Sequence, residues 1–269
     1  MSIIELISAE RLQTYEKLTV GQKQAIALHN HTLQLASSLM SMIALLELAL
    51  RNTTNQRLIE DFGDDQWLLP NHSAIPLKQQ EMRMISKAHS QAQRALYSKL
   101  SYKEKSFLDC FAFPQGVPVN TIHKTKVNKR QALYVVSHGQ VISQTTIAFW
   151  KRLYSNDYEN DLWKPSLKRV FPNKKMKRIQ ISRALENIYA ARNRVAHHEP
   201  IYGVRLEQTM TSLALIRNSI GAQSLDHDTP FKKFSKVLYL RLQMDYEGFK
   251  EAWETLTEER VLPSVTAAP

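Results

Sequence analysis

Four polar side chains near residue 195 form the group in this sequence that is best suited to chemistry. In the string ARNRVAHHEP, Arg192 and Asn193 are followed by the adjacent histidines His197 and His198. A histidine can transfer a proton near neutral pH, and an arginine can stabilise a negatively charged transition state. RNA supplies its own nucleophile, the 2′-hydroxyl, so these residue types suffice for a ribonuclease that leaves a 2′,3′-cyclic phosphate and a 5′-hydroxyl. DNA lacks that hydroxyl and would not be cut.

The group must be positioned by a helix that ends close to it. Apolar residues recur at helical spacing before it, and Pro200 predicts that the helix ends just after His198. Arg192 falls on the same stripe, where a charged side chain needs a reason. Asn193 and His197 are one turn apart, and the negative end of the helix dipole favours positive charge there. The stripe consists of Ile181, Leu185, Ile188, Arg192 and Val195.

A structural interpretation of the same residues stays open. In it, Arg192 pairs with a buried acid and His197 simply caps the helix. The spacing RxxxxH is common by chance, so this interpretation would be preferred for an arbitrary string.

The rest of the chain predicts an all-α fold. Only 7 of 269 residues are glycine, which disfavours turn-rich β-sandwiches and Gly-rich phosphate loops. We expect helices over 22–60, 77–109 with a break near Ser101, 131–154, about 181–198, 204–219 and 233–258. A loop is expected over 113–129 and a basic connector over 162–176, a strand stays possible near Val135 and Val141, and the last dozen residues should fray. No composition break demands two domains, so one domain over 1–269 is the simplest organisation.

Three blocks of sequence resemble a known family. The string RNRVAHHEPI is similar to the RNxxxH motif of the HEPN superfamily, in the form found in Abi-like abortive-infection proteins of the AbiF and AbiD type. SAERLQTYEKL, followed by ALLELALRNTTNQRLIEDFGDDQWL, resembles the opening of that family, and GQVISQTTIAFWKRLYSNDYENDLWKPSLKRVFP resembles its middle. Together these blocks cover most of residues 8–205 in the order of the family.

The resemblance implies a HEPN-type helical bundle with a basic insertion and a metal-independent endoribonuclease. It further implies a role as a toxin or antiphage effector, and a site often completed by dimerisation. Arg192 and His197 match the RxxxxH pair, and Asn193 matches the polar residue after the arginine. On an ideal helix Arg192 and His197 are about 140° apart, so a distorted last turn or a symmetric partner must bring them to one phosphate. The spacing also leaves His198 open as the working imidazole.

A second polar set lies at the end of the most apolar segment. Glu47 and Arg51 are one helical turn apart, and Asn52 follows. They either support the site by orienting its residues or form a routine helix ion pair worth ~0.3–0.5 kcal/mol. Neither Arg51 nor Arg217, which also precedes an asparagine, has a histidine five residues later, so neither completes a second motif.

The net charge of +11 is concentrated in one segment. Residues 110–185 contain 14 Lys and Arg and 3 acids, whereas the rest of the chain contains 22 of each. Such a zone is typical of polyanion binding, although a solvated basic face is the alternative. The residues expected to bind RNA are Lys124, Lys126, Lys129, Arg130, Lys168, Arg169, Lys174, Lys175, Lys177 and Arg178.

Other features narrow the class of protein. The single Cys110 excludes a disulfide framework, and no spaced His, Cys or acid cluster predicts a metal site or another cofactor. The N-terminus lacks the features of a signal peptide, and the most apolar window, 39–50, is too short to span a bilayer. We therefore expect a cytoplasmic protein without a membrane partner.

The expected partners are RNA, as substrate or as a regulatory non-coding RNA, a second copy of the chain, and an antitoxin. Two other functions remain open. The chain would be an inactive module that holds a structured non-coding RNA, or a protein-interaction scaffold.

Overall fold

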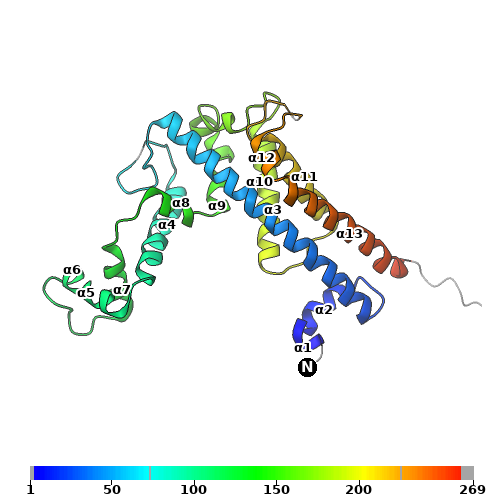
Figure 1. The fold of residues 1–269 in the computed structure, drawn as a ribbon, viewed down its shortest axis with the longest axis horizontal. Helices are drawn as coiled ribbons and strands as arrows, with labels where there is room; N and C mark the ends of the chain where they lie inside the picture. Colours follow the sequence, from blue (N-terminus) through cyan, green and yellow to red (C-terminus); the bar gives the residue numbers. More distant parts are fainter. Residues whose placement is uncertain (1–2, 73, 225, 262–269) are drawn as a thin grey trace, which may run out of the picture. The chain divides into compact units, whose positions relative to one another are not determined.

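The computed structural model describes residues 3–72, 74–224 and 226–261. About 72% of the chain is helical, and these residues contain no strand, which confirms the all-α fold class. The elements are α1 (Ile3–Ile7), α2 (Ala9–Glu16), α3 (Gln22–Phe62), α4 (Gln79–Ser98), α5 (Tyr102–Phe107), α6 (Asp109–Ala112), α7 (His123–Ala132), α8 (His138–Gln144), α9 (Ile147–Arg152), the 3₁₀-helix η1 (Asn156–Tyr158), the π-helix η2 (Glu159–Trp163), the 3₁₀-helix η3 (Leu167–Val170), α10 (Arg178–Ala196), α11 (Gly203–Ser219), α12 (Pro230–Phe234) and α13 (Lys236–Val261) (Figure 1).

The chain divides into two compact units. The terminal unit comprises residues 1–50 and 171–269, and the inserted unit comprises 51–170. The predicted basic segment 110–185 therefore does not form one structural piece, because the boundary at Val170 splits it. This division does not test whether the chain is a single domain, which stays a prediction.

Helix α3 supplies the core of the terminal unit with its apolar face. Leu28, Leu35, Leu39, Met42 and Leu46 are fully buried, at the spacing of one helical face. No glycine or proline interrupts the helix, and it ends where Gly63 adopts a φ of 71° that disfavours residues with a Cβ. The helix predicted over 22–60 is confirmed, and it ends two residues later than expected.

Helices α10 and α11 pack side by side in the terminal unit (Figure 1). Ile181, Leu185 and Ile188 on α10 are fully buried, as are Leu213 and Ile216 on α11. Between the two helices, Asn187 Nδ2 donates a hydrogen bond of 3.1 Å to Ser212 Oγ. This packing fixes the helix whose C-terminal end carries the candidate site.

The inserted unit is built around aromatic residues and one buried carboxylate. Trp150, Tyr154 and Tyr158 are fully buried, and Trp163 is 4% exposed, so both tryptophans are core anchors of this unit. Glu81 is also fully buried; it pairs with Arg152 and accepts a hydrogen bond of 2.7 Å from Tyr158 Oη.

Burial raises the pKa of Glu81, but hydrogen bonds from Tyr158 and Arg152 outweigh burial and hold it below its ordinary value. The neighbouring apolar side chain on α4, Met82, is 49% exposed, so this helix buries a carboxylate and exposes a methionine.

Several expected boundaries in the inserted unit are wrong. The loop expected over 113–129 ends at Ile122, because residues 123–132 form α7. The helix expected over 131–154 is two shorter helices, α8 and α9, each preceded by an extended Ser or Thr. The break expected near Ser101 is confirmed, since Ser101 forms a capping box with Glu104 at the start of α5.

The terminal helices agree with expectation more closely. Helices α11 and α13 begin within three residues of the expected starts, and α13 runs three residues past the expected end. The short α12 was not expected. The expected fraying concerns residues that lie mostly outside the described ones.

Over the described ranges, α3 is long and apolar enough by composition to cross a membrane, with a mean hydropathy of 1.7 in an 18-residue window. The apolar stretch is thus longer than the window at 39–50 indicated. The core helix of a soluble protein has the same properties, so the absence of a membrane partner and a cytoplasmic location stay predictions.

Candidate functional site

The candidate site lies at the C-terminal end of α10. Ala191 and Val195 carry the buried face of the helix through its last turn, and Arg192 lies beside them, half-buried. Arg192 is therefore at the edge of the core-facing stripe and not within it, as the spacing had suggested. Its guanidinium group can reach solvent without losing the packing of the helix.

The helix ends in a Schellman turn formed by the two histidines. His197, the C-cap residue, departs from helical geometry with φ −94° and ψ 10°, and His198 has φ 55°. The N–H of Glu199 donates to the carbonyl of Arg194 at 2.8 Å, and the N–H of His198 donates to that of Val195 at 3.0 Å. These are the two hydrogen bonds of that motif, in which glycine normally takes the left-handed position. A histidine there is held in a strained backbone conformation.

Arg194 stabilises this turn from its outer side. Its Nε and Nη2 atoms donate to the carbonyl oxygen of Pro200 at 3.2 and 3.0 Å, and Nη1 is 3.1 Å from Glu199 Oε2. The reversed chain after the helix is thus tied back to the last turn. Arg194 has a structural role that the motif alone did not reveal.

The other four polar side chains of the motif are left unengaged. Within the described residues, the side chains of Arg192, Asn193, His197 and His198 have no hydrogen bond or ion pair. The structural interpretation required a buried acid next to Arg192, and the described part of the chain provides none. His197 occupies the cap position through its backbone, and its imidazole is exposed. The group is free to bind a ligand.

The second polar set is spread along α3. Glu47 is half-buried in the terminal unit, while Arg51 and Asn52 begin the inserted unit. Arg51 Nε donates a hydrogen bond of 3.4 Å to Asn52 Oδ1. This neighbour contact gives no support for an orienting role, which stays a prediction.

The basic residues of α7 do not act alike. Lys124 and Lys129 are exposed, and Lys129 lies over the Phe113 ring. Arg130 is only 8% exposed and donates two hydrogen bonds, of 2.7 and 2.6 Å, to the Asp109 carboxylate. Lys126 Nζ is 2.8 Å from the same carboxylate. Asp109 lies one residue before the basic segment 110–185, and its carboxylate offsets part of the positive charge of that segment.

The contact between Asp109 and Arg130 shifts the pKa of each residue in the direction that favours its charged form. Hydrogen bonds from Arg130 and Lys126 lower the pKa of Asp109 from 3.8 to about 2, and the bond to Asp109 raises the pKa of Arg130. Arg130 is therefore an internal cation of the inserted unit, and this geometry favours a structural role over RNA contact.

The remaining basic residues fall on both sides of the unit boundary. Lys168 and Arg169 belong to the inserted unit, where Arg169 Nη2 is 2.7 Å from Asp61 Oδ2. In the terminal unit, Lys174, Lys175 and Lys177 are exposed on the approach to α10, whereas Arg178 is 8% exposed. Three free lysines thus precede the helix that carries the candidate site.

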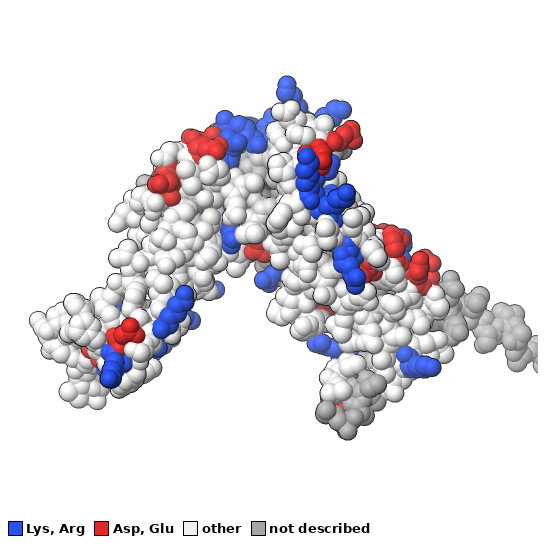
Figure 2. Space-filling model, in the orientation of Figure 1, with Lys and Arg blue, Asp and Glu red and all other residues white. Residues whose placement is uncertain are grey.

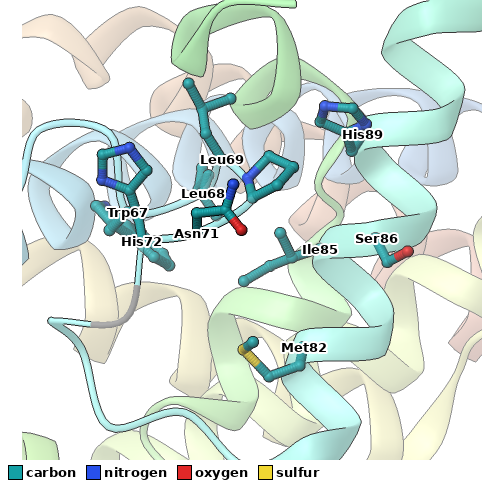
Figure 3. A pocket seen from close by; sticks show the side chains of 10 residues that line it. Trp67, Leu68, Leu69, Asn71, His72, Met82, Ile85, Ser86 and His89 are labelled. Carbon is teal, nitrogen blue, oxygen red and sulfur yellow. The ribbon is translucent and has the colours of Figure 1, made fainter. Parts of the chain in front are cut away.

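A pocket of about 220 Å³ belongs to the inserted unit and shares no lining residue with the α10 site. The loop residues Trp67 and His72 face Met82, Ile85 and His89 of α4 (Figure 3). No Lys or Arg lines it, and His72 Nδ1 is 3.0 Å from Asp64 Oδ1. Its lining suits a small apolar or aromatic group and provides no cation for a phosphate.

Sequence reasoning set aside one residue that the structure singles out. Arg217 is buried, lies in a basic pocket and has no acid partner among the described residues. Its only sequence signal is an arginine within the apolar pattern of α11, and no histidine follows it at the RxxxxH spacing.

Searches against known proteins found nothing similar. No protein-family model, no curated protein and no solved structure matches the chain. No group of three or more His, Cys, Asp or Glu side chains placed to hold a metal ion occurs in the described ranges.

Proposed function

We propose that this chain is a HEPN-type endoribonuclease that cleaves RNA through the 2′-hydroxyl. The observation that carries the proposal is the group of four polar side chains at the Schellman turn of α10, to which no described residue provides a hydrogen bond or ion pair. Folded proteins normally satisfy such groups or leave them fully solvated, and here a half-buried arginine stands close in sequence to two histidines. The resemblance of RNRVAHHEPI to the HEPN motif supports the same reading.

In the proposed reaction, the 2′-oxygen attacks the adjacent phosphorus while His197 accepts the proton of the hydroxyl. The bond between phosphorus and the 5′-oxygen breaks, and the 5′-oxygen takes a proton from a second imidazole or from water. Arg192 stabilises the phosphorane charge, which is greatest in the transition state. Asn193 positions the phosphate by hydrogen bonding. His198 is the second candidate for the proton transfer.

The Schellman turn affects how the Arg192 and His197 side chains are oriented, which on an ideal helix would be about 140° apart. The last turn departs from helical geometry at His197 and reverses at His198. A second copy of the chain would supply the remaining groups, so we propose a homodimer. Exposed apolar side chains at Phe234, Val237, Leu240 and Met244 recur along α12 and α13 and support self-association. The mass of the protein in solution tests this step.

The biological role follows from the resemblance. We propose a cytoplasmic toxin or abortive-infection effector against phage, restrained by an antitoxin or a regulatory RNA until infection. The free lysines 174, 175 and 177 would hold the phosphate backbone, with an affinity that falls as salt rises.

The alternative is an inactive HEPN protein that holds a structured non-coding RNA. Both functions predict RNA binding, and they differ in turnover. Incubating purified protein with RNA in EDTA distinguishes them: the ribonuclease releases fragments in a reaction that depends on Arg192 and His197, and the inactive module releases none.

A further inference from the structure

Arg217 is a buried cation near the C-terminal end of α11. Arg217 is 9% exposed, and the Cζ atom of its guanidinium group lies 4.4 Å from the centroid of the Tyr239 ring. It donates hydrogen bonds to Ser235 Oγ at 2.8 Å, to the carbonyl of Lys232 at 2.8 Å and to Asn218 Oδ1 at 3.2 Å. All three acceptors are neutral. In the described ranges no carboxylate pairs with this guanidinium.

The contacts fix the guanidinium group but do not neutralise it. A guanidinium carries five N–H groups, so two remain without an acceptor among the described residues. Burial lowers the pKa of Arg217, while Tyr239 and Asp228 oppose that shift. Buried charges in proteins are normally paired, because leaving one unpaired is expensive. An anion bound from outside the chain would lower the free-energy cost of burying this unpaired charge.

Arg217 forms part of the wall of a pocket of about 420 Å³. Lys232, Lys233 and Lys236 also line the pocket, and Asp228 is its one acid, 3.6 Å from Lys233 Nζ. Four cations thus face one carboxylate. Figure 2 shows Lys and Arg side chains gathered over α12 and the start of α13. Each water displaced from the pocket occupies ~30 Å³. The pocket therefore holds many waters, and their displacement leaves room for more than a single phosphate group.

The pocket is built into a rigid junction between α12 and α13. Ser235 is fully buried; its hydroxyl accepts from Arg217 and donates to the carbonyl of Phe231 at 2.7 Å. Thr229, 1% exposed, caps α12 by accepting from the backbone N–H of Lys232 at 3.2 Å. The guanidinium therefore holds its place before any ligand arrives, which reduces the entropy lost on binding.

We propose that this pocket binds a terminal phosphate or polyphosphate group. A guanidinium presents paired N–H groups that match phosphate oxygens, and the lysines add point charges around it. The phosphate would come from a free nucleotide or from the 5′ end of an RNA. The inference goes beyond the proposed ribonuclease function and does not need Arg192 or His197.

An ordinary solvated lysine patch would lack the buried guanidinium. Lys250, on α13 outside the pocket, shows the ordinary case: its Nζ is 2.9 Å from Glu247 Oε2, and both side chains are exposed. Lys250→Gln therefore removes the same unit charge from the same unit of the protein without touching the pocket.

Calorimetric titration of the full-length protein with pyrophosphate, and separately with ATP, tests the proposal. We expect saturable binding that Arg217→Gln weakens about 10-fold or more, because charge-assisted hydrogen bonds to the phosphate are lost. Lys233→Gln and Lys236→Gln keep the buried contacts and should each weaken binding about 3-fold. Lys250→Gln should bind as the wild type does. Absence of saturable binding to either probe, or an equal loss in Lys250→Gln and the two pocket-lysine variants, would overturn the proposal.

A second titration separates the two sources of phosphate. The probes are ATP and a 2′-O-methyl oligoribonucleotide, which cannot undergo 2′-hydroxyl cleavage, with either a 5′-triphosphate or a 5′-hydroxyl. If the 5′-triphosphate oligomer binds more tightly than both the 5′-hydroxyl oligomer and ATP, the pocket is assigned to RNA ends. If ATP binds more tightly than the 5′-triphosphate oligomer, the pocket is assigned to nucleotides. Equal affinity for the two oligomers together with no ATP binding contradicts the proposal. Arg192→Ala should retain phosphate binding, which separates failure here from failure of the proposed ribonuclease.

Discussion

The ends of α10 and α11 carry the same Arg-Asn pair in opposite surroundings. Arg192 is half-buried, and no described residue pairs with its side chain, whereas Arg217 is 9% exposed and held by three neutral acceptors and a ring. The chain after α10 turns back through two histidines, and the chain after α11 continues through extended Ile220. The same dipeptide therefore provides a side chain free to act in one helix and a fixed cation in the other.

A third arginine shows what a neutralised buried cation looks like. Arg130 is as buried as Arg217, at 8% exposed, but it meets the Asp109 carboxylate through two hydrogen bonds. Burial of an arginine alone thus does not indicate function. Among the described residues, Arg217 has no carboxylate partner, and the Arg192 side chain has no partner of any kind.

The largest expected effect concerns the end of α10. Arg192→Ala or His197→Ala should each reduce RNA cleavage by about 10³-fold, because one removes the stabilising charge and the other the proton acceptor. Neither side chain has a described partner, so the free energy of unfolding should change by less than ~0.5 kcal/mol. Cleavage of a labelled RNA and chemical denaturation measure the two quantities. Lys250→Gln is the matched control and should cleave normally.

The two buried arginines should differ in what their removal does to stability. Arg130→Met leaves the Asp109 carboxylate with Lys126 alone and should lower the free energy of unfolding by about 2 kcal/mol. Arg217→Met removes an unpaired buried charge along with its neutral hydrogen bonds, so the two changes offset and the loss should be under ~1 kcal/mol. Urea denaturation of both variants makes the comparison. A larger loss in Arg217→Met would show that Arg217 is the structural cation.

The strained histidine gives a smaller effect that separates its two possible roles. His198→Gly relieves the left-handed backbone and should raise the free energy of unfolding by ~0.5–1 kcal/mol. Retained cleavage in this variant assigns the proton transfer to His197, and lost cleavage assigns it to His198. A destabilised variant would contradict the Schellman turn at this position.

The stability of the inserted unit should also depend on pH. Because Arg130 and Lys126 lower the pKa of Asp109 from 3.8 to about 2, the folded state binds its proton less readily than the unfolded state does. The resulting stability is complete above about pH 4 and is lost as the pH falls toward 2. Asp109→Asn should flatten the acid side of the stability profile. An unchanged profile would show that the pair contributes nothing, as with many surface ion pairs.

Periodicity predicted the long helices because one apolar face determines them. The bounds of α3 and α10 agree with expectation to within about three residues, since neither contains an interior glycine or proline and each has a clear stop signal. Short helices such as α7 depend on tertiary packing, and a polar sequence with four cations gave no apolar stripe to recognise.

The candidate site was predictable in composition but not in geometry. The string ARNRVAHHEP placed the polar residues, but the left-handed His198 and the role of Arg194 depend on the turn after the helix. The pairing of Arg130 with Asp109 joins residues 21 positions apart, and the burial of Glu81 depends on Arg152 and Tyr158 of later elements. Such pairs have no signal in local sequence.

The central claim is that RNA supplies the nucleophile to residues at the end of α10. The direct test places a single 2′-deoxynucleotide at the cleavage position of an otherwise all-RNA substrate and follows the reaction in EDTA. We expect cleavage of the all-RNA strand to give 2′,3′-cyclic phosphate and 5′-hydroxyl ends, and the substituted strand to resist cleavage at that position. Cleavage of the substituted strand at the same bond, or cleavage that persists in the Arg192→Ala, His197→Ala double variant, would contradict the account.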